Sequence, residues 1–237
     1  MSDLTKNIKI PKWVLILVGL IMLTLLCAYF FLTIEDPKWN ALFTGLLSSF
    51  IVSILIFYFS IQPLRELQKF HDSGVVSLLS GRHDKVYYSP IVSKSRGKVF
   101  VMGASCSRFV DDFLDGDADD HMLLDAMNRH STLTVKLLVP SKKHMDDASE
   151  KKFSIAQPKL KKVREKFPEQ FEVKSMDSPA SHSFVITDNE FIGGPIFADD
   201  ESKNSPAVHV KSSTPYARKH QNFFEREWNK GTDALES

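Results

Sequence analysis

Two long apolar runs dominate the N-terminal part of the chain. Trp13 to Ile34 and Ala41 to Ile61 contain no Asp, Glu, Lys, Arg or His. At the rise of an α-helix the first run is about 33 Å long, enough to cross a hydrocarbon core of about 30 Å. Neither run has an amphipathic face, so burial in a soluble core does not explain them. We therefore predict transmembrane helices over 13–34 and 41–61, joined by the polar turn 35–40.

Basic residues flank these two runs unevenly. The first run is preceded by Lys6, Lys9 and Lys12, and the second is followed by Arg65, Lys69 and Arg82. The turn contains only Lys38. Because Lys and Arg near membrane segments favour the cytoplasmic side, we expect residues 1–12 and the C-terminal part to be cytoplasmic and the turn periplasmic. A signal peptide fits less well, since the first run is too long and no small-x-small cleavage site follows.

The second run carries a row of small residues. Gly45, Ser49 and Ser53 recur every four residues and share one helix face. Small residues at this spacing let helices approach closely in lipid. The face either packs on the first span of the same chain or joins protomers in a homo-oligomer. Neither span contains an ionisable residue other than Cys and Tyr, which argues against a transporter or a proton relay.

From Pro63 onward the hydrophobic pattern is that of a globular domain. An amphipathic pattern from Pro63 to Gly81 predicts a linker helix over 62–82. Beyond it, short apolar strands alternate with helices. We expect strands at 98–102, 133–139, 171–174, 183–186, 191–192 and 207–210, and helices at 107–114, 118–130, 158–167 and from Thr214 to Gly231. This alternation predicts one α/β domain over 83–237, with a mixed sheet covered by helices.

Charge and cysteine content narrow the function of this domain. The chain has 30 Lys and Arg against 29 Asp and Glu, which argues against a strongly basic nucleic-acid binder. Cys27 and Cys106 are the two cysteines, so a disulfide scaffold and a thiolate zinc site are excluded. The histidines form no HExxH motif. We expect no metal and no cofactor.

Two charged segments have both a plain and a functional interpretation. The acidic segment consists of Asp111, Asp112, Asp115, Asp117, Asp119 and Asp120. It does not match the calcium-loop spacing, because Gly116 follows too soon, and is best explained as a solvated turn. The basic one is either a solvated helix face or a contact for lipid headgroups or nucleic-acid phosphate: Lys142, Lys143, Lys151, Lys152, Lys159, Lys161, Lys162, Arg164 and Lys166. Within it, Lys159, Lys161, Lys162 and Arg164 are candidate contacts.

The loop after the first domain strand has part of a nucleophile-elbow pattern. Gly103-Ala-Ser105-Cys-Ser107 lacks the final glycine of that motif. We therefore expect Ser105 to be a loop residue, although backbone amides there could contact an anionic ligand.

The most suggestive stretch runs from His182 to Pro195, HSFVITDNEFIGGP. It resembles the phospholipase D superfamily, whose motif has a histidine at a strand start, a lysine two residues later, an aspartate after the strand and a hairpin into a glycine-rich turn. The resemblance covers roughly residues 85 to 230 as one copy. It implies a histidine that attacks phosphorus, a second that acts as acid, and lysines that hold the phosphoryl oxygens.

The chain departs from this pattern where the chemistry needs it most. Phe184 stands at the lysine position, Asp188 comes one residue early, and no second histidine-lysine pair exists. Without those lysines, the charge of the transition state is uncompensated. We therefore predict that the domain is not an enzyme and that His182 is structural or contacts a ligand. If it is an enzyme, His182 and Asp188 are its catalytic residues.

Over its whole length the chain is most similar to the transmembrane effector of bacterial retron systems. This resemblance implies a toxin held inactive by a reverse transcriptase with its multicopy single-stranded DNA. Release would damage the inner membrane and cause abortive infection. Two other functions stay open from the residues: a membrane-tethered phosphodiesterase that acts through His182, and a membrane-anchored adaptor.

Overall fold

The computed structural model describes residues 12–82, 84–118, 121–197 and 204–236. Lys6 and Lys9 of the predicted cytoplasmic N-terminus lie outside these ranges, as do Asp119 and Asp120 of the acidic segment. The chain divides into two compact units, Met1–Phe70 and His71–Ser237.

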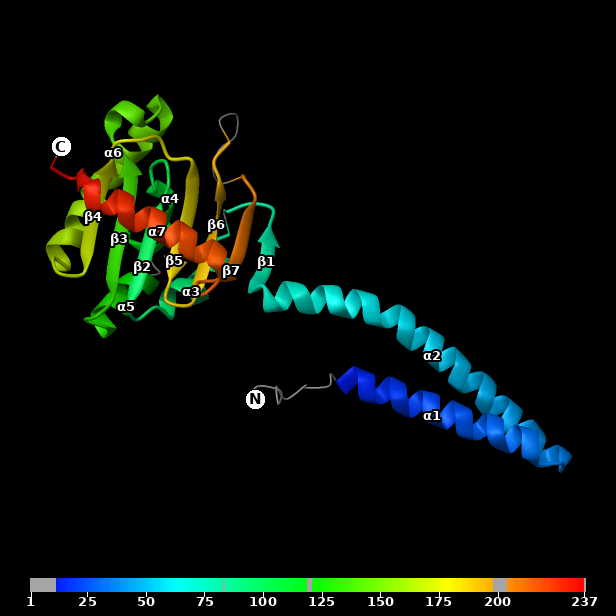
Figure 1. Ribbon diagram of the computed structural model, residues 1–237. Coiled ribbons are helices and arrows are strands. Elements are labelled where there is room, and N and C mark those ends of the chain that lie inside the picture. The colour runs from blue at the N-terminus through cyan, green and yellow to red at the C-terminus, as the bar shows by residue number, and fades with distance from the viewer. Residues whose placement is uncertain (1–11, 83, 119–120, 198–203, 237) are drawn as a thin grey trace, which may run out of the picture. The chain divides into compact units, whose positions relative to one another are not determined.

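The first unit consists of two long helices, α1 (Lys12–Thr33) and the larger part of α2 (Pro37–Asp72), which lie close together at the turn and diverge from it (Figure 1). Within them, Val14–Thr33 and Pro37–Ile61 are long and apolar enough to cross a membrane, with mean hydropathies of 2.8 and 2.2. Pro37 occupies the first position of α2, where its missing N–H costs nothing. The rings of Phe30 and Phe43 stack with centroids 5.2 Å apart, which joins the two helices near the turn.

The predicted linker helix over 62–82 is wrong in its second half. Helix α2 runs through Pro63 to Asp72, and β1 (Val75–Leu79) follows as a strand. Between them Gly74 has φ +76°, a conformation that ends a helix readily only at glycine. The segment Val75–Leu79 is rich in branched residues, and β7 offers it a pairing partner. Strand pairing therefore outweighs the helical pattern of this segment.

The second unit is built on one mixed sheet with the strand order β1-β7-β6-β5-β2-β3-β4-β8. Its remaining strands are β2 (Lys98–Met102), β3 (Thr134–Pro140), β4 (Phe171–Met176), β5 (His182–Thr187), β6 (Glu190–Pro195), β7 (Ala207–Lys211) and β8 (Thr232–Asp233). Strands β2, β3 and β4 are parallel, and the other pairs are antiparallel. The predicted α/β class with a mixed sheet is confirmed.

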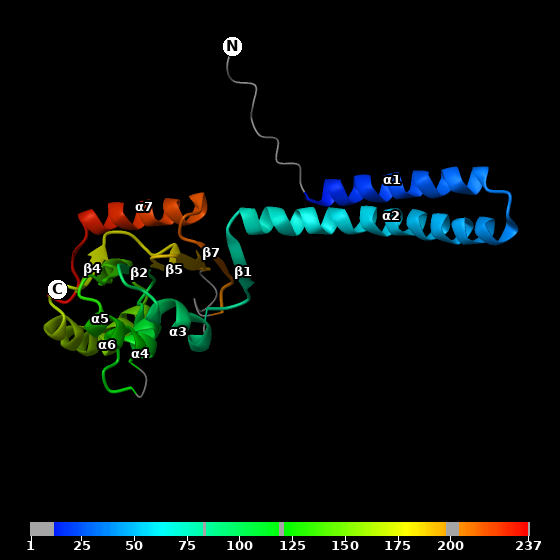
Figure 2. The same ribbon diagram turned by 90° about the horizontal axis from the view of Figure 1, so that it is seen from below.

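Helices cover both faces of this sheet (Figure 2). On one face lie α3 (Lys85–Ser93), α4 (Ser107–Phe113), α5 (Met122–Arg129) and α6 (Asp147–Lys166), the last preceded by a 3-10 turn at Lys142–His144. On the other lies α7 (Pro215–Lys230), capped by the Thr214 hydroxyl. Two apolar clusters fill the spaces between sheet and helices, and β3 is buried from both sides.

Two helices differ from their predicted bounds, and a third was not predicted. Helix α6 does not begin at Pro158, because the Asp146 carboxylate caps it earlier by accepting the Ser149 N–H at 2.7 Å. Helix α5 begins at Met122, later than predicted. Helix α3 was not predicted, since Pro90 lies inside it and its apolar residues also fit an extended segment.

Candidate functional site

His182 begins β5 and lies beside α7. Its Nδ1 is 2.9 Å from the Ser181 hydroxyl, and its ring meets that of His220 edge to face, 5.3 Å between centroids. Burial lowers the pKa of His182, and the nearby His220 and Arg82 lower it further. The imidazole is therefore neutral at neutral pH, a state in which one ring nitrogen keeps a lone pair.

Phe184 occupies the position where the phospholipase D motif has lysine, and it belongs to the core. Its side chain is 2% exposed and packs with the rings of Phe191 and Phe224. A Cβ at Gly193 on the neighbouring strand would collide with Phe184, so this hairpin needs glycine there. The motif's lysine position therefore contributes no positive charge near His182.

Asp188 lies at the opposite end of β5 from His182, so the structure does not bring these two residues together. Its carboxylate accepts backbone N–H groups of Arg96, Gly97 and Lys98 at 2.7, 3.0 and 2.8 Å. Burial alone would raise the pKa of Asp188, but these three hydrogen bonds outweigh it and the pKa is lowered. The carboxylate thus anchors the β5–β6 turn to the start of β2.

Arg82 is a site residue that the sequence did not reveal. Its guanidinium donates to the carbonyl oxygens of Ser183 at 3.4 Å and Pro206 at 3.3 Å, and to that of Pro195. It therefore ties β5 to the end of β6 and to the segment before β7. Since these partners are more than a hundred residues away, at separations of 101 to 124, no local pattern could identify the role.

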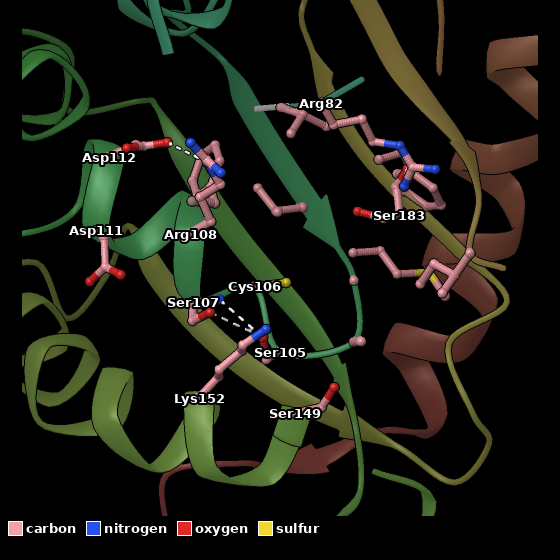
Figure 3. A pocket seen from close by; sticks show the side chains of 18 of the residues that line it. Arg82, Ser105, Cys106, Ser107, Arg108, Asp111, Asp112, Ser149, Lys152 and Ser183 are labelled. Atoms are coloured by element: carbon pink, nitrogen blue, oxygen red, sulfur yellow. Dashed lines mark hydrogen bonds and ion pairs between the residues drawn. The ribbon is translucent and has the colours of Figure 1, made fainter. Parts of the chain in front are cut away.

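A cleft of about 1000 Å³ opens at the carboxyl end of β2, on the face of α4 and α6 (Figure 3). Ser105 lines it, as predicted for a loop residue, with its hydroxyl 3.1 Å from that of Ser107. Cys106 between them has φ 53°, and burial raises the pKa of its thiol to about 12. The thiol is thus protonated at neutral pH and is no nucleophile.

Three of the four candidate basic contacts are paired with acidic residues of the same domain. Lys159 binds Asp111 and Asp115 at 2.6 and 2.8 Å. The others form pairs of 3.5 Å and 2.6 Å, Lys162 with Asp117 and Arg164 with Asp233. Lys161 is exposed. Lys159 and Lys162 therefore pair with the acidic segment itself, which favours the solvated-face interpretation for these two lysines.

The small-residue row on α2 is exposed along its length. Gly45, Ser49 and Ser53 are all exposed, and a Cβ at Gly45 would meet no atom within 4 Å. The Ser49 hydroxyl donates to the Gly45 carbonyl at 2.9 Å, and that of Ser53 to the Ser49 carbonyl at 2.8 Å. In this chain the row is therefore not covered by α1.

A buried polar chain on β6 and β7 was also not predicted. The Tyr87 hydroxyl lies 2.6 Å from His209 Nδ1, and His209 Nε2 lies 3.1 Å from Glu190, which also binds Lys211. Burial lowers the pKa of His209, although Glu190 partly opposes this. Within the described ranges, no group of three or more His, Cys, Asp or Glu side chains is placed to hold a metal ion.

No family model matches the sequence, and no curated protein matches it. Solved structures similar to it include TrmBL2, an archaeal chromatin protein with a novel mode of DNA binding, at 12% identity and a TM-score of 0.45 over 85% of this chain and 72% of that one. NucT from Helicobacter pylori has 10% identity and a TM-score of 0.41, over 66% and 97% of the two chains. Phosphatidylserine synthase from Haemophilus influenzae Rd KW20 has 11% identity and a TM-score of 0.42, over 65% of this chain and 36% of that one. Likenesses of this strength assign no function.

Proposed function

We propose that this protein is a membrane-damaging effector of a bacterial anti-phage system, anchored in the inner membrane by α1 and α2 with both chain ends in the cytoplasm. One observation carries the proposal. Only 6% and 0% of the apolar windows in the two helices are buried, so the pair of helices does not bury its apolar surface within itself. Apolar surface of this extent is stable in lipid or against partner helices, not in water.

In this proposal the α/β domain is a phospholipase D-like fold that restrains the helices and does not catalyse. The strand and hairpin positions around His182 support the fold, and buried Phe184 supports the loss of the reaction. Asp188 is occupied with backbone amides and adds no acid or base beside His182. A phosphoryl group there would lack the positive charges that stabilise its transfer.

The type of system we propose is a retron. A reverse transcriptase with its multicopy single-stranded DNA would bind the domain and keep protomers apart. Loss of that complex would let the exposed Gly45, Ser49 and Ser53 faces of different protomers pack together. A difference in partner affinity of about 5.5 kcal/mol between the two states would move the balance from 1:99 to 99:1. Clustered helices without ionisable groups would leak, with no selectivity.

The experiment is induction of the full chain in bacteria, with and without its genomic neighbours. We expect rapid dye entry and loss of membrane potential when the chain is expressed alone, and protection when a neighbouring reverse transcriptase and its DNA are co-expressed. Intact membranes in cells that accumulate the chain in the membrane fraction would refute the proposal.

One observation favours a second function, a membrane-tethered phosphodiesterase. His182 is neutral and lies at a strand start beside His220, so its imidazole has a lone pair available for attack. The variant His182→Ala separates the two functions. An enzyme would lose its effect on cells outright, whereas the effector proposed above would keep its toxicity as long as the domain folds.

A further inference from the structure

The cleft beside β2 lies across the sheet from the His182 ring, although Arg82 and Phe184 belong to its lining and also lie near that histidine or its partner His220. Neighbouring residues of a strand point to opposite faces of the sheet, and in β5 Ser183 lines the cleft while His182 packs against His220 of α7. The cleft instead lies at the carboxyl end of parallel strand β2, enclosed by α3, α4 and α6. In open α/β sheets, crevices at this end of the strands are where ligands bind.

Basic side chains from three parts of the chain line this cleft: Arg82 and Lys85 just before and at the start of α3, Arg108 on α4 and Lys152 on α6. Figure 3 shows Lys152 extending from α6 toward the Ser105–Ser107 loop, with Arg108 on the same side and Arg82 opposite. The three parts are far apart in sequence, so the fold gathers their charge around one space.

The acidic side chains of the lining have partners within the domain. Asp111 binds Lys159, which is not itself part of the lining, at 2.6 Å. Asp112 pairs with Arg108 at 3.5 Å. Asp146 caps α6 by accepting the Ser149 N–H at 2.7 Å. The lining thus holds four basic and three acidic side chains, and Lys159 adds a basic partner for one of the acidic ones from outside the lining.

The rest of the lining suits a ligand with both a polar and an aromatic part. Hydroxyl groups of four serines contribute to it: Ser105, Ser107, Ser149 and Ser183. The walls also include Phe109 and Ile192, and Phe197 lines the cleft with its side chain 49% exposed. An exposed aromatic ring beside basic side chains can stack a base while the charges hold a phosphate.

We propose that this cleft binds a nucleotide, with its phosphate at Arg108 and Lys152 and its base against Phe197. A volume of about 1000 Å³ is at the upper end of small-molecule sites. The nucleotide is either free in the cytoplasm or the phosphorylated end of a nucleic-acid strand, since both present the same group. Binding does not depend on the effector function proposed above and is measured without it.

The test is calorimetric titration of the full chain, purified in detergent, with three probes. These are ATP, inorganic phosphate and a 5′-phosphorylated oligothymidylate of six nucleotides. We expect ATP or the oligonucleotide to bind at micromolar to submillimolar concentration. Tighter binding of ATP identifies a free nucleotide as the ligand, and tighter binding of the oligonucleotide identifies a strand end; either result supports the proposal.

Variants locate the site. Arg108→Gln with Lys152→Gln should weaken the binding of the tighter probe about tenfold or more, because charge-assisted hydrogen bonds to phosphate are lost. The matched pair Arg218→Gln with Lys219→Gln, exposed on α7 across the sheet, should change it less than about twofold. Phe197→Ala should weaken the binding of ATP more than the binding of inorganic phosphate.

Two results would overturn the proposal. One is the absence of binding by ATP and by the oligonucleotide up to about 1 mM. The other is unchanged affinity in the double variant with a wild-type unfolding midpoint. Should the double variant unfold, Lys152→Gln alone decides, because Lys152 is exposed and its truncation leaves the core intact.

Discussion

At the residue scale, position 184 sets what chemistry His182 can perform. A lysine there would have to place its ammonium among Phe191, Phe224 and the backbone of Gly193, in a space that is filled by an aromatic ring. Burying an unpaired charge costs several kcal/mol. The surroundings of position 184 are thus those of a core residue. Replacing Phe184 with lysine would therefore cost stability.

The Asp188 carboxylate stabilises the turn between β5 and β6. We expect Asp188→Ala to lower the free energy of unfolding of the domain by about 2–4 kcal/mol, since three backbone N–H groups lose a charged acceptor. Asp117→Ala is the matched control, because its carboxylate is 84% exposed and bound to Lys162 at 3.5 Å; it should cost less than about 0.5 kcal/mol. Thermal unfolding of the purified chain measures both, and equal effects would contradict this role.

The polar chain through His209 predicts a pH dependence of stability. Burial lowers the pKa of His209 below its ordinary value of 6.5. As pH falls through about 6.5, the unfolded chain binds a proton that the folded domain does not, so the folded state loses stability down to the lower folded pKa. Burial also lowers the pKa of His182, so this histidine likewise destabilises the folded state as pH falls.

The variant His209→Gln tests this, because an amide can accept from Tyr87 and donate to Glu190 without titrating. We expect the unfolding midpoint of the wild type to fall between about pH 7.5 and pH 5.5, and that of the variant to fall less. An identical pH slope in both chains would rule out His209 as a source.

At the scale of elements, the sequence was sufficient where the pattern was local. The two apolar helices, strands β2 and β3, the β5–β6 hairpin and α7 with its Thr214 cap were all predicted with small errors in their bounds. Strand β1 was not, because its apolar residues fit a helix until β7 pairs with them. Helix α6 was truncated in prediction at Pro158, although the cap that begins it is Asp146.

Candidate sites were harder to predict than elements for the same reason. His182, Ser105 and the small-residue row follow local motifs and could be singled out. Arg82, Arg108 and Lys152 meet only through the fold, and the acidic partners of Lys159 lie on α4 and the loop after it. Long-range pairing of charges leaves no spacing in the sequence from which to infer it.

The small-residue row leads to a prediction about α2. Gly45→Leu with Ser49→Leu should abolish the membrane damage while insertion into the membrane stays intact, because leucines keep the helices of different protomers apart. The control is Ser48→Leu, which places bulk beside the row and not on it. Dye entry after induction measures the damage and carbonate extraction the insertion. Wild-type toxicity of Gly45→Leu with Ser49→Leu would contradict clustering through this face.

For the whole molecule, the chain divides into an apolar helical part and a folded α/β domain. The apolar windows up to Ile61 carry hydropathy enough for a membrane, and the domain that follows has a folded core of its own. If the domain restrains the helices, its removal should release them. If it only presents a surface to a partner, its removal should leave a harmless anchor. The effector and the membrane-anchored adaptor therefore predict opposite effects of removing the domain.

A chain of residues 1–80 decides between them. The effector function predicts that this truncated chain causes dye entry at least as fast as the full chain, and that co-expressed reverse transcriptase and DNA no longer protect, because the restraining contact is gone. Gly45→Leu with Ser49→Leu in the truncated chain should suppress the damage, which ties it to helix packing and not to overexpression. Cells that tolerate the truncated chain at membrane levels equal to those of the toxic full chain would show that the domain is needed for damage. The activity would then have to be sought in the α/β domain, beginning with His182 and the cleft.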